Sequence, residues 1–476
     1  MLKGMAHIFS AETLVLPTGM VTAIFLARYL GPAGYGIFAL VSQLVIWLEQ
    51  SSAFGLTDST IRFVSGTKKW ERPANTFLFL YLATGLMLAA FFQLAAPLLS
   101  KLFQDPDMTA FFRLFALDTP FYCLSLGIQY VLAGRHRFRD QAFMSAVYWT
   151  SRMILIILFV LGGMGIQGAV LGSITASCIQ MIAGCILLRP RIGAGFLKIT
   201  KHLMGFIAPL SAAIVFLRLF RMELFMIKAL GASAAFTGYY GAALNLSMTP
   251  FLFSKSLSPP LLSICTHLLD DQKTDSARLM ARTAIRSLFW LVPLFTGAVS
   301  LSPELIRLIF GSHFMPAVPV FQILMPAAYG LMIIRISFTL FVAMGKPGWT
   351  FFIAFPMVPL AFTAHLIMIP RIGSIGAAVV TAAFAMLGGI IALAMCLSVW
   401  SLRFPLGTLS KCVGIAVLVH LFCVMWPISG VLIFVKILLV IAISISGLIL
   451  FREFSAAEIR SLNNWLLRRS VTGNIK

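Results

Sequence analysis

The stretch Leu30-Gly31-Pro32-Ala33-Gly34-Tyr35-Gly36 joins two apolar segments, near residues 6–27 and 36–55. A helix of about 20 apolar residues covers the ~30 Å hydrocarbon thickness of a bilayer, so each segment is long enough for one crossing. Similar segments recur to the end of the 476-residue chain. The stretch is therefore interpreted as a turn between membrane helices, and the chain is predicted to be an all-α polytopic membrane protein.

Composition excludes a water-soluble fold. Hydrophobic residues make up 60% of the chain and charged residues 11%, whereas an ordinary soluble domain has roughly 25% charged residues. The seven cysteines lie in apolar segments without a C-x-x-C pair, so neither a disulfide nor a zinc site is expected.

A scan for apolar segments predicts about fourteen transmembrane helices. The first six are expected near residues 6–27, 36–55, 74–99, 111–133, 142–161 and 168–188. The next six are expected near 202–230, 238–261, 284–301, 318–343, 349–369 and 376–400, and a final pair near 413–425 and 431–451. This predicts a six-helix lobe at 1–188, a basic cytoplasmic linker at 189–201, a second six-helix lobe at 202–400, an extra helix pair at 401–451 and a basic cytoplasmic tail at 452–476.

The two lobes are predicted to be pseudo-symmetric, because motifs of the first half recur in the second. The first turn is matched by Leu230-Gly231-Ala232 followed by Gly238-Tyr239-Tyr240-Gly241. Gly165-Ile166-Gln167-Gly168 is matched by Gly373-Ser374-Ile375-Gly376, and Leu132-Ala133-Gly134-Arg135 more loosely by Ala343-Met344-Gly345-Lys346. The matches keep one order at an offset near 200 to 210 residues. Many transporters are built from two such repeats, which move around one binding site.

The formal charge of +21 is explained by membrane topology. In the predicted connections, 24 Lys and Arg residues fall on one side of the membrane and six on the other. The positive-inside rule then places both termini in the cytoplasm. Nucleic acid is not expected as a partner, because lipid head groups account for the basic excess.

The stretch from Ala27 to Leu40, continuing to Ala53-Phe54-Gly55-Leu56, resembles the opening of the Wzx-type polysaccharide and O-antigen flippases. These form a branch of the multidrug/oligosaccharidyl-lipid/polysaccharide exporter superfamily. The resemblance implies a flippase of the bacterial inner membrane that translocates an undecaprenyl-diphosphate-linked oligosaccharide to the outer leaflet by alternating access. It also suggests a glycan polymerase and a chain-length regulator as partners, beside the lipid-linked substrate and membrane lipids.

The ionisable residues at membrane depth independently favour an anionic cargo. Ionised side chains are unfavourable there by about 2.5 to 3.5 kcal/mol each, so those present usually face a cavity, a partner or a substrate. Six such residues are basic, namely Lys436 and the five named below, and four are acidic. Since arginine donates paired hydrogen bonds to phosphate oxygens, the predicted site for a diphosphate head group consists of Arg218, Arg221, Lys255, Arg152 and Arg335. The candidates for coupling-ion binding or for ion pairs are the carboxylates Glu12, Glu49, Asp118 and Glu223.

No catalytic motif, nucleotide site or metal site is found in the sequence, so an enzyme, a cofactor and a bound metal are not expected. Two alternatives stay open. A cation-coupled drug antiporter of the same superfamily would share the fold, although a cationic drug favours an acidic cavity. A membrane glycan polymerase or ligase would act on the same lipids, although the predicted outer connections are short for such an enzyme.

Overall fold

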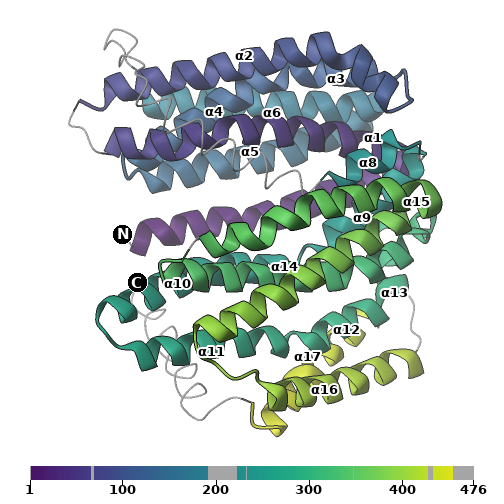
Figure 1. Ribbon diagram of the computed structural model, residues 1–476. Coiled ribbons are helices and arrows are strands. Elements are labelled where there is room, and N and C mark those ends of the chain that lie inside the picture. The colour runs from purple at the N-terminus through teal and green to yellow at the C-terminus, as the bar shows by residue number, and fades with distance from the viewer. Residues whose placement is uncertain are drawn as a thin grey trace, which may run out of the picture. The chain divides into compact units, whose positions relative to one another are not determined.

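The computed structural model describes residues 2–65, 69–190, 222–231, 233–346, 348–426 and 432–453. Within these ranges, side chains are described everywhere except at 2–16, 50–55, 58, 62, 351 and 354. Every regular element in these ranges is a helix, which confirms the all-α class (Figure 1). The described residues fall into two compact units, residues 1–243 with 358–380, and residues 244–357 with 381–476.

The first unit is built mainly from helices that run through the first half of the chain. They are α1 (Leu2–Ser65), α2 (Glu71–Leu102), α3 (Met108–Ala116), α4 (Asp118–Gly134), α5 (Phe138–Phe159), α6 (Gly165–Leu188), α8 (Glu223–Ala229) and α9 (Ala234–Ser247). Helices α1, α2, α4, α5 and α6 pack side by side, and a cluster of buried side chains from Val64 to Leu188 fills the space between one set of their ends. The buried side chains of this cluster therefore face other helices of the same unit.

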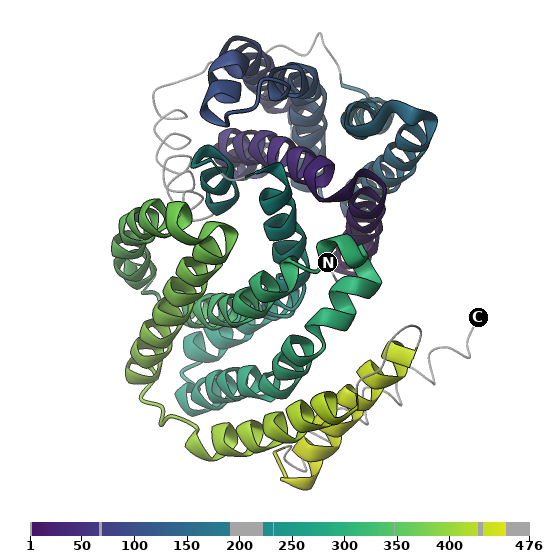
Figure 2. The same ribbon diagram turned by 90° about the vertical axis from the view of Figure 1, so that its right-hand side faces the viewer.

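The second unit contains the remaining helices and part of α15. They are α10 (Phe251–Asp270), α11 (Thr274–Trp290), α12 (Val292–Ser300), α13 (Ser302–Phe310), α14 (Ala317–Ala343), α15 (Gly348–Val399), α16 (Leu406–Met425) and α17 (Ile433–Leu450). Helix α10 packs on α14, and α12 packs on α16. Helices α16 and α17 form the predicted extra pair and lie side by side (Figure 2).

Nine helical segments of the described residues are long and apolar enough to cross a membrane. Phe138–Leu188 and Gly348–Val399 are 51 and 52 residues long, more than twice the roughly 20 residues that one crossing needs. Each is interrupted near a glycine, as is α1 at Gly31, whose φ is 68°. These interruptions fall between the predicted helices 6–27 and 36–55, 142–161 and 168–188, and 349–369 and 376–400. The total of about fourteen spans stays a prediction.

Short interruptions also fall within three other predicted spans, at 111–133, 238–261 and 284–301. Met108–Gly134 and Thr274–Ser300 nevertheless each form one segment long and apolar enough to cross a membrane. The breaks lie at Leu117, at 248–250 and at Leu291. A proline lies at or just after each break, namely Pro120 in the first turn of α4, Pro250 directly before α10, and Pro293 in the first turn of α12. Proline has no N–H group and clashes with the carbonyl one turn earlier, but it is tolerated in the first turn. The short helix α13, with Pro303 in its first turn, was not predicted.

The same backbone conformation recurs at Gly165 and Gly373, two positions that the sequence repeat pairs with each other. Gly165 has φ and ψ of 54° and −133°, and Gly373 has 58° and −137°. A side chain is strained in this region, whereas glycine adopts it freely. Three residues later, the next glycine of each motif packs against backbone. A Cβ atom on Gly168 would lie 2.9 Å from the Phe159 carbonyl, and one on Gly376 would lie 2.5 Å from the Met368 carbonyl oxygen. Both motifs therefore form one turn and one close helix crossing.

The looser sequence match, Gly134 with Gly345, is shifted by two residues in the structure. Gly134 is the last residue of helix α4, whereas Gly345 lies beyond α14 with φ of 70°. The residue with the corresponding left-handed conformation after α4 is His136, with φ of 58°. Arg137 N–H donates to Leu132 and Lys346 N–H to Phe341, which is the same pattern at both helix ends. The structural offset is then 345 − 136 = 209, close to 373 − 165 = 208 for the following turn.

The compact units do not follow the predicted lobes. Residues 222–243 and 358–380, which the sequence assigns to the second lobe, group with the first 190 residues. The predicted domain boundaries, with a lobe ending at 188 and another beginning at 202, therefore stay a prediction based on the repeat. Residues 191–201 of the predicted linker and residues 454–476 of the predicted tail lie outside the described residues.

Candidate functional site

Three of the nine predicted site residues lie outside what the structure describes. Arg218 and Arg221 belong to the stretch 191–221, and Glu12 lies in α1 at a position without a described side chain. The other six are distributed over separate places. Arg152, Glu49, Asp118 and Glu223 are in the first unit, and Lys255 and Arg335 are in the second.

Arg152, Glu49 and Asp118 come together inside the first unit. They project from α5, α1 and α4, three helices that contact one another. Glu49 is 1% exposed and Asp118 is 3% exposed. Arg152 is half-buried, and its Nε donates a hydrogen bond of 3.2 Å to Ser173 Oγ. Its guanidinium also lies over the rings of Tyr148 and Trp149, at 5.9 and 5.6 Å from their centroids, a favourable cation–π geometry.

The charges of this buried cluster are unevenly balanced. Glu49 and Asp118 repel each other, and Arg152 attracts both. Glu49 Oε1 and Asp118 Oδ1 are buried and accept no hydrogen bond within the distance criterion from any described residue, although Ser177 of α6 interacts with the Asp118 carboxylate. A buried carboxylate without such partners is unfavourable when ionised. The cluster is therefore suited to taking up a proton or a small cation, or to exchanging partners around Arg152.

The sequence interpretation missed a polar face of α6 beside this cluster. Ser173, Ser177 and Gln180 are all at most 2% exposed, and their spacing of four and three residues places them on one helical face. Gln180 accepts a hydrogen bond of 2.8 Å from Ser125 of α4 and donates one of 3.2 Å to the Met144 carbonyl of α5. The spacing of these polar residues within an apolar span was the available signal.

Lys255 and Arg335 lie on the packed pair α10 and α14. Arg335 lies over the ring of Phe251, 5.9 Å from its centroid, and its buried Nε has no acceptor among the described residues. Lys255 is exposed and follows Phe251 by four residues, so the two share a face of α10. The structure thus brings two predicted cations to one helix pair of the second unit.

Glu223 is the first residue of α8 and is 4% exposed. Five residues later, Lys228 forms an ion pair of 3.3 Å with Asp105 in the connection between α2 and α3. Glu223 thus begins a short helix whose other end is tied to the first unit.

Comparisons with known proteins place the chain among polysaccharide biosynthesis proteins. A family model with that description matches residues 25–319, which is more than half of the chain. The chain belongs to this family. The succinoglycan biosynthesis transport protein ExoT of Rhizobium meliloti (strain 1021) is 25% identical over 312 residues, covering 64% of this chain and 61% of ExoT. This chain therefore matches about three fifths of that relative's length.

Solved structures show the fold of this family member. It is similar to the lipid II flippase MurJ in an inward closed conformation, with a TM-score of 0.76 at 16% identity, covering 94% of this chain and 99% of that one. It is also similar to an inward-facing multidrug resistance MATE transporter of the MOP superfamily, with a TM-score of 0.68 at 12% identity, covering 81% and 94%. The superfamily fold expected from the sequence is confirmed, and the protein is a multi-pass membrane protein.

Polar contacts near both ends of α17 hold the extra helix pair, α16 and α17, to the other helices of the second unit. Lys436 has no exposed surface, lies 3.4 Å from Glu304 Oε1 of α13 and donates to the Cys423 carbonyl at 2.9 Å. The sequence interpretation counted Lys436 among the cations at membrane depth, and the structure shows how its charge is satisfied. It therefore adds little to the positive charge available to a substrate.

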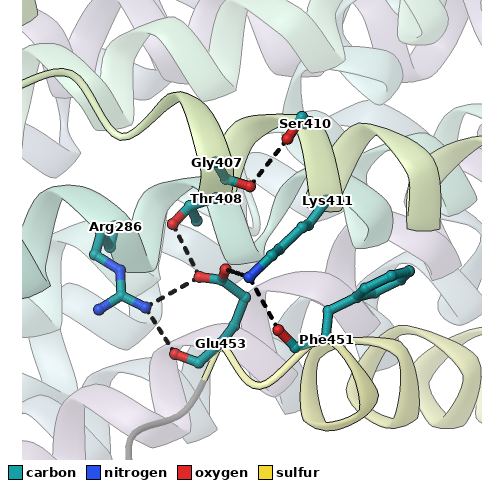
Figure 3. Close-up of polar contacts among 7 residues, drawn as sticks. All are labelled: Arg286, Gly407, Thr408, Ser410, Lys411, Phe451 and Glu453. Atoms are coloured by element: carbon teal, nitrogen blue, oxygen red, sulfur yellow. Dashed lines mark hydrogen bonds and ion pairs between the residues drawn. The ribbon is translucent and has the colours of Figure 1, made fainter.

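The opposite end of α17 is held by Glu453, which is 3% exposed (Figure 3). Arg286 of α11 donates to its Oε2 at 3.0 Å and to its carbonyl oxygen at 2.7 Å. Thr408 and Lys411 of α16 donate to its two carboxylate oxygens, both at 2.9 Å. Burial by itself would raise the pKa of Glu453, but the hydrogen bonds from Lys411, Arg286 and Thr408 outweigh it and lower the pKa to about 2.

One cavity of about 250 Å³ lies in the second unit, between α12, α14, α15 and α16. Its lining is mostly apolar, and its polar members include Ser300 and His420, whose Oγ and Nδ1 are 2.8 Å apart. None of the predicted cations lines it. It is also smaller than the roughly 300 to 1,000 Å³ of typical ligand sites, so it does not serve as the head-group site.

Proposed function

We propose that this protein is a flippase that moves an undecaprenyl-diphosphate-linked oligosaccharide from the cytoplasmic to the outer leaflet of the bacterial inner membrane, with both termini in the cytoplasm. The observation that carries the proposal is the family match over residues 25–319. The name of the relative ExoT, a transport protein of polysaccharide biosynthesis, supports transport as the activity. The fold shared with a lipid II flippase supports a lipid-linked cargo.

The diphosphate head group is proposed to bind Arg218, Arg221, Lys255 and Arg335, with Arg152 added in one state of the buried cluster. Phosphate oxygens accept paired hydrogen bonds from arginine, and Arg335 Nε lacks an acceptor among the described residues. Arg152 lies beside two carboxylates. When either is protonated, Arg152 is less fully compensated and attracts an anion more strongly.

This charge arrangement gives a proposal for coupling. Proton binding to Glu49 or Asp118 leaves the positive charge of Arg152 less compensated, so it strengthens diphosphate binding near Arg152. Bound diphosphate in turn strengthens proton binding to the same carboxyl groups, because such coupling is reciprocal. A proton gradient could then drive the transport cycle. Glu12 and Glu223 stay secondary candidates for the same role.

The decisive experiment is transfer of a labelled prenyl-diphosphate oligosaccharide across proteoliposomes, compared with efflux of a cationic dye. The flippase proposal expects transfer of the lipid and no dye efflux. The excess of carboxylates over arginine in the buried cluster is the observation that favours the second candidate, a cation-coupled drug antiporter. Dye efflux without lipid transfer would favour that candidate.

Substitution of Arg335 tests the head-group site. Arg335→Gln removes the charge and the paired donors, so we expect a tenfold or greater loss of lipid transfer, corresponding to roughly 1.4 kcal/mol or more of lost charge-assisted hydrogen bonding. The control is Arg113→Gln, since Arg113 is exposed in α3. Equal transfer by both variants, at matched protein levels in the vesicles, would remove Arg335 from the site.

A further inference from the structure

The cavity of the second unit has the size of a small-molecule site. It measures about 250 Å³ and lies between α12, α14, α15 and α16, with every lining residue in that unit. A cavity of roughly 150 Å³ holds benzene, so this one has room for a single ring with a short alkyl chain. It has no room for the proposed lipid-linked cargo. Any occupant is therefore a separate ligand.

The apolar part of the lining favours an aromatic ligand. Phe295 and Tyr329 meet edge to face, with ring centroids 5.3 Å apart and an interplanar angle of 67°. Met325 and Met386 belong to the same lining. Aromatic rings pack favourably on the edges of other rings and on methionine sulfur. The cavity therefore suits a flat ring better than a straight hydrocarbon chain.

The hydrogen bonds of Ser300 determine which nitrogen of His420 carries the proton. Ser300 Oγ donates to the Thr296 carbonyl at 2.8 Å and lies 2.8 Å from His420 Nδ1. A hydroxyl has a single proton, so the second contact requires Nδ1–H to donate to Ser300. In the neutral ring Nε2 is then an acceptor, and it has no partner among the described residues. The cavity wall thus carries an unused hydrogen-bond acceptor.

Tyr329 adds a second unsatisfied polar group to the lining. Its hydroxyl is buried and has no hydrogen-bond partner in the part of the chain that the structure describes. An unpaired buried hydroxyl is unfavourable. A ligand that carries a hydroxyl group therefore complements the polar part of the lining, whereas a pure hydrocarbon does not.

The cavity is reached at membrane depth. Pro326 and His420 line it, and both are exposed. They lie within the predicted spans 318–343 and 413–425, where a charged molecule is unfavourable. The position of the opening therefore favours an uncharged ligand that dissolves in the bilayer.

We propose that this cavity binds a small phenol from the membrane, with its ring packed on Phe295 and the two methionines and its O–H donating to His420 Nε2. The ring matches the aromatic and sulfur-containing walls, and the hydroxyl matches the acceptor that the Ser300 contact creates. The site is separate from the proposed head-group site, because none of the predicted head-group residues lines it. The proposal therefore stands or falls independently of the cargo.

Photolabelling of the full chain in lipid nanodiscs tests the site. The probe is a phenol that carries a small diazirine group, and mass spectrometry locates the labelled residues. We expect label on the lining of α12, α14, α15 or α16, and protection by unlabelled 4-ethylphenol. Ethylbenzene, which lacks only the hydroxyl, should need about a fivefold higher concentration in the membrane for the same protection, as one hydrogen bond predicts. Equal protection by the two compounds, or label spread over the surface without protection, would overturn the proposal.

His420→Leu tests the acceptor. The variant removes Nε2, so the roughly fivefold advantage of 4-ethylphenol over ethylbenzene should disappear. The matched control is His313→Leu, because His313 is exposed and lies outside the lining. This control should keep the advantage. A retained advantage in His420→Leu would show that the ligand hydroxyl binds elsewhere and would overturn the assignment.

Val299→Phe tests the cavity itself, because Val299 belongs to the lining. The larger side chain occupies the space of the ligand, so labelling of the lining should fall by about tenfold or more. The control is Val417→Phe, at a position of α16 that is 52% exposed and outside the lining. Unchanged labelling in Val299→Phe would contradict the site. If this variant does not fold, the comparison of the two compounds on the unsubstituted chain and on His420→Leu decides.

Discussion

At the residue scale, Glu453 shows how a sequence pattern fails to reveal a key contact. Its partner Arg286 is 167 residues away, and no periodicity connects the two positions. Arg286 was only one of the 24 basic residues that the sequence assigned to the cytoplasmic side, although it binds a nearly buried carboxylate. Cations such as Lys255 and Arg335 were recognised because charges in apolar spans are rare, but their grouping on α10 and α14 needed the structure.

Glu453 is predicted to stabilise the protein in a pH-dependent way. Its pKa is about 2 in the folded protein, against an ordinary value of 4.5. The stabilisation is therefore complete above pH 4.5 and is lost as the pH falls toward 2. We expect Glu453 to stabilise the folded protein by about 1 to 2 kcal/mol, because its partners Arg286 and Lys411 are 23% and 39% exposed.

The check is thermal unfolding of the wild type and Glu453→Gln in detergent between pH 7 and pH 3. The variant should melt a few degrees lower at pH 7, and the difference should shrink below pH 4.5. Asp275→Asn is the control, because Asp275 is 99% exposed. A difference that stays constant down to pH 3 would mean that Glu453 acts by another route.

At the element scale, the sequence predicted the long helices well because apolar length is the dominant constraint in a bilayer. It did not reveal the interruptions beside Pro250 and Pro293, because apolar windows do not respond to backbone geometry. The glycine turns at Gly165 and Gly373 were found by their repetition. Their nearly identical φ and ψ angles show that the repeat is a backbone feature as well as a sequence feature.

The two glycine turns yield a paired prediction. Gly165→Ala and Gly373→Ala should each destabilise the protein by about 1 to 3 kcal/mol, since both positions have positive φ and extended ψ, a region that is essentially limited to glycine. No atom lies within 4 Å of a Cβ at either position, so the effect comes from the backbone alone. Thermal unfolding measures it, with Gly414→Ala in α16 as the control, where a Cβ also meets nothing. Unequal losses at the two turns would indicate that the conformations are not equivalent.

The buried ion pair of the extra helix pair gives a further prediction at this scale. Lys436→Met leaves Glu304 without its partner and should destabilise the protein by about 2 to 4 kcal/mol. Adding Glu304→Gln should recover part of this loss, because no unpaired charge then remains. Thermal unfolding of the two single variants and the double variant measures the coupling. Additive losses would show that the two side chains do not interact.

At the scale of the whole molecule, the family and the superfamily fold could be anticipated from one glycine-rich turn and its repetition. The grouping of charges could not, because the sequence treated Arg152 and the carboxylates near it as separate classes. The head-group site itself stays a prediction. Charge type and membrane depth can be read from sequence. Which charges face each other depends on the packing of α1, α4 and α5.

That packing makes coupling testable for the molecule as a whole. Glu49 and Asp118 are nearly fully buried and share Arg152, so protonation of one should favour cargo binding. In the double variant Glu49→Gln with Asp118→Asn, Arg152 is permanently without an opposing carboxylate in the cluster. Lipid transfer by this variant should lose its dependence on a pH gradient, while the wild type should respond to the gradient by about tenfold, corresponding to roughly 1.4 kcal/mol of coupling.

The matched control for this prediction is Asp140→Asn, which removes a more exposed carboxylate of the same unit from its pair with Arg137. It should retain the wild-type response, because Asp140 lies outside the cluster. Binding of the diphosphate lipid, measured without a gradient, should be at least as tight in the double variant as in the wild type, since no carboxylate then competes for Arg152. Weaker binding in the double variant would show that the two carboxylates support the cargo site directly, and a retained gradient response would place the coupling group on another residue, with Glu12 and Glu223 the next to test.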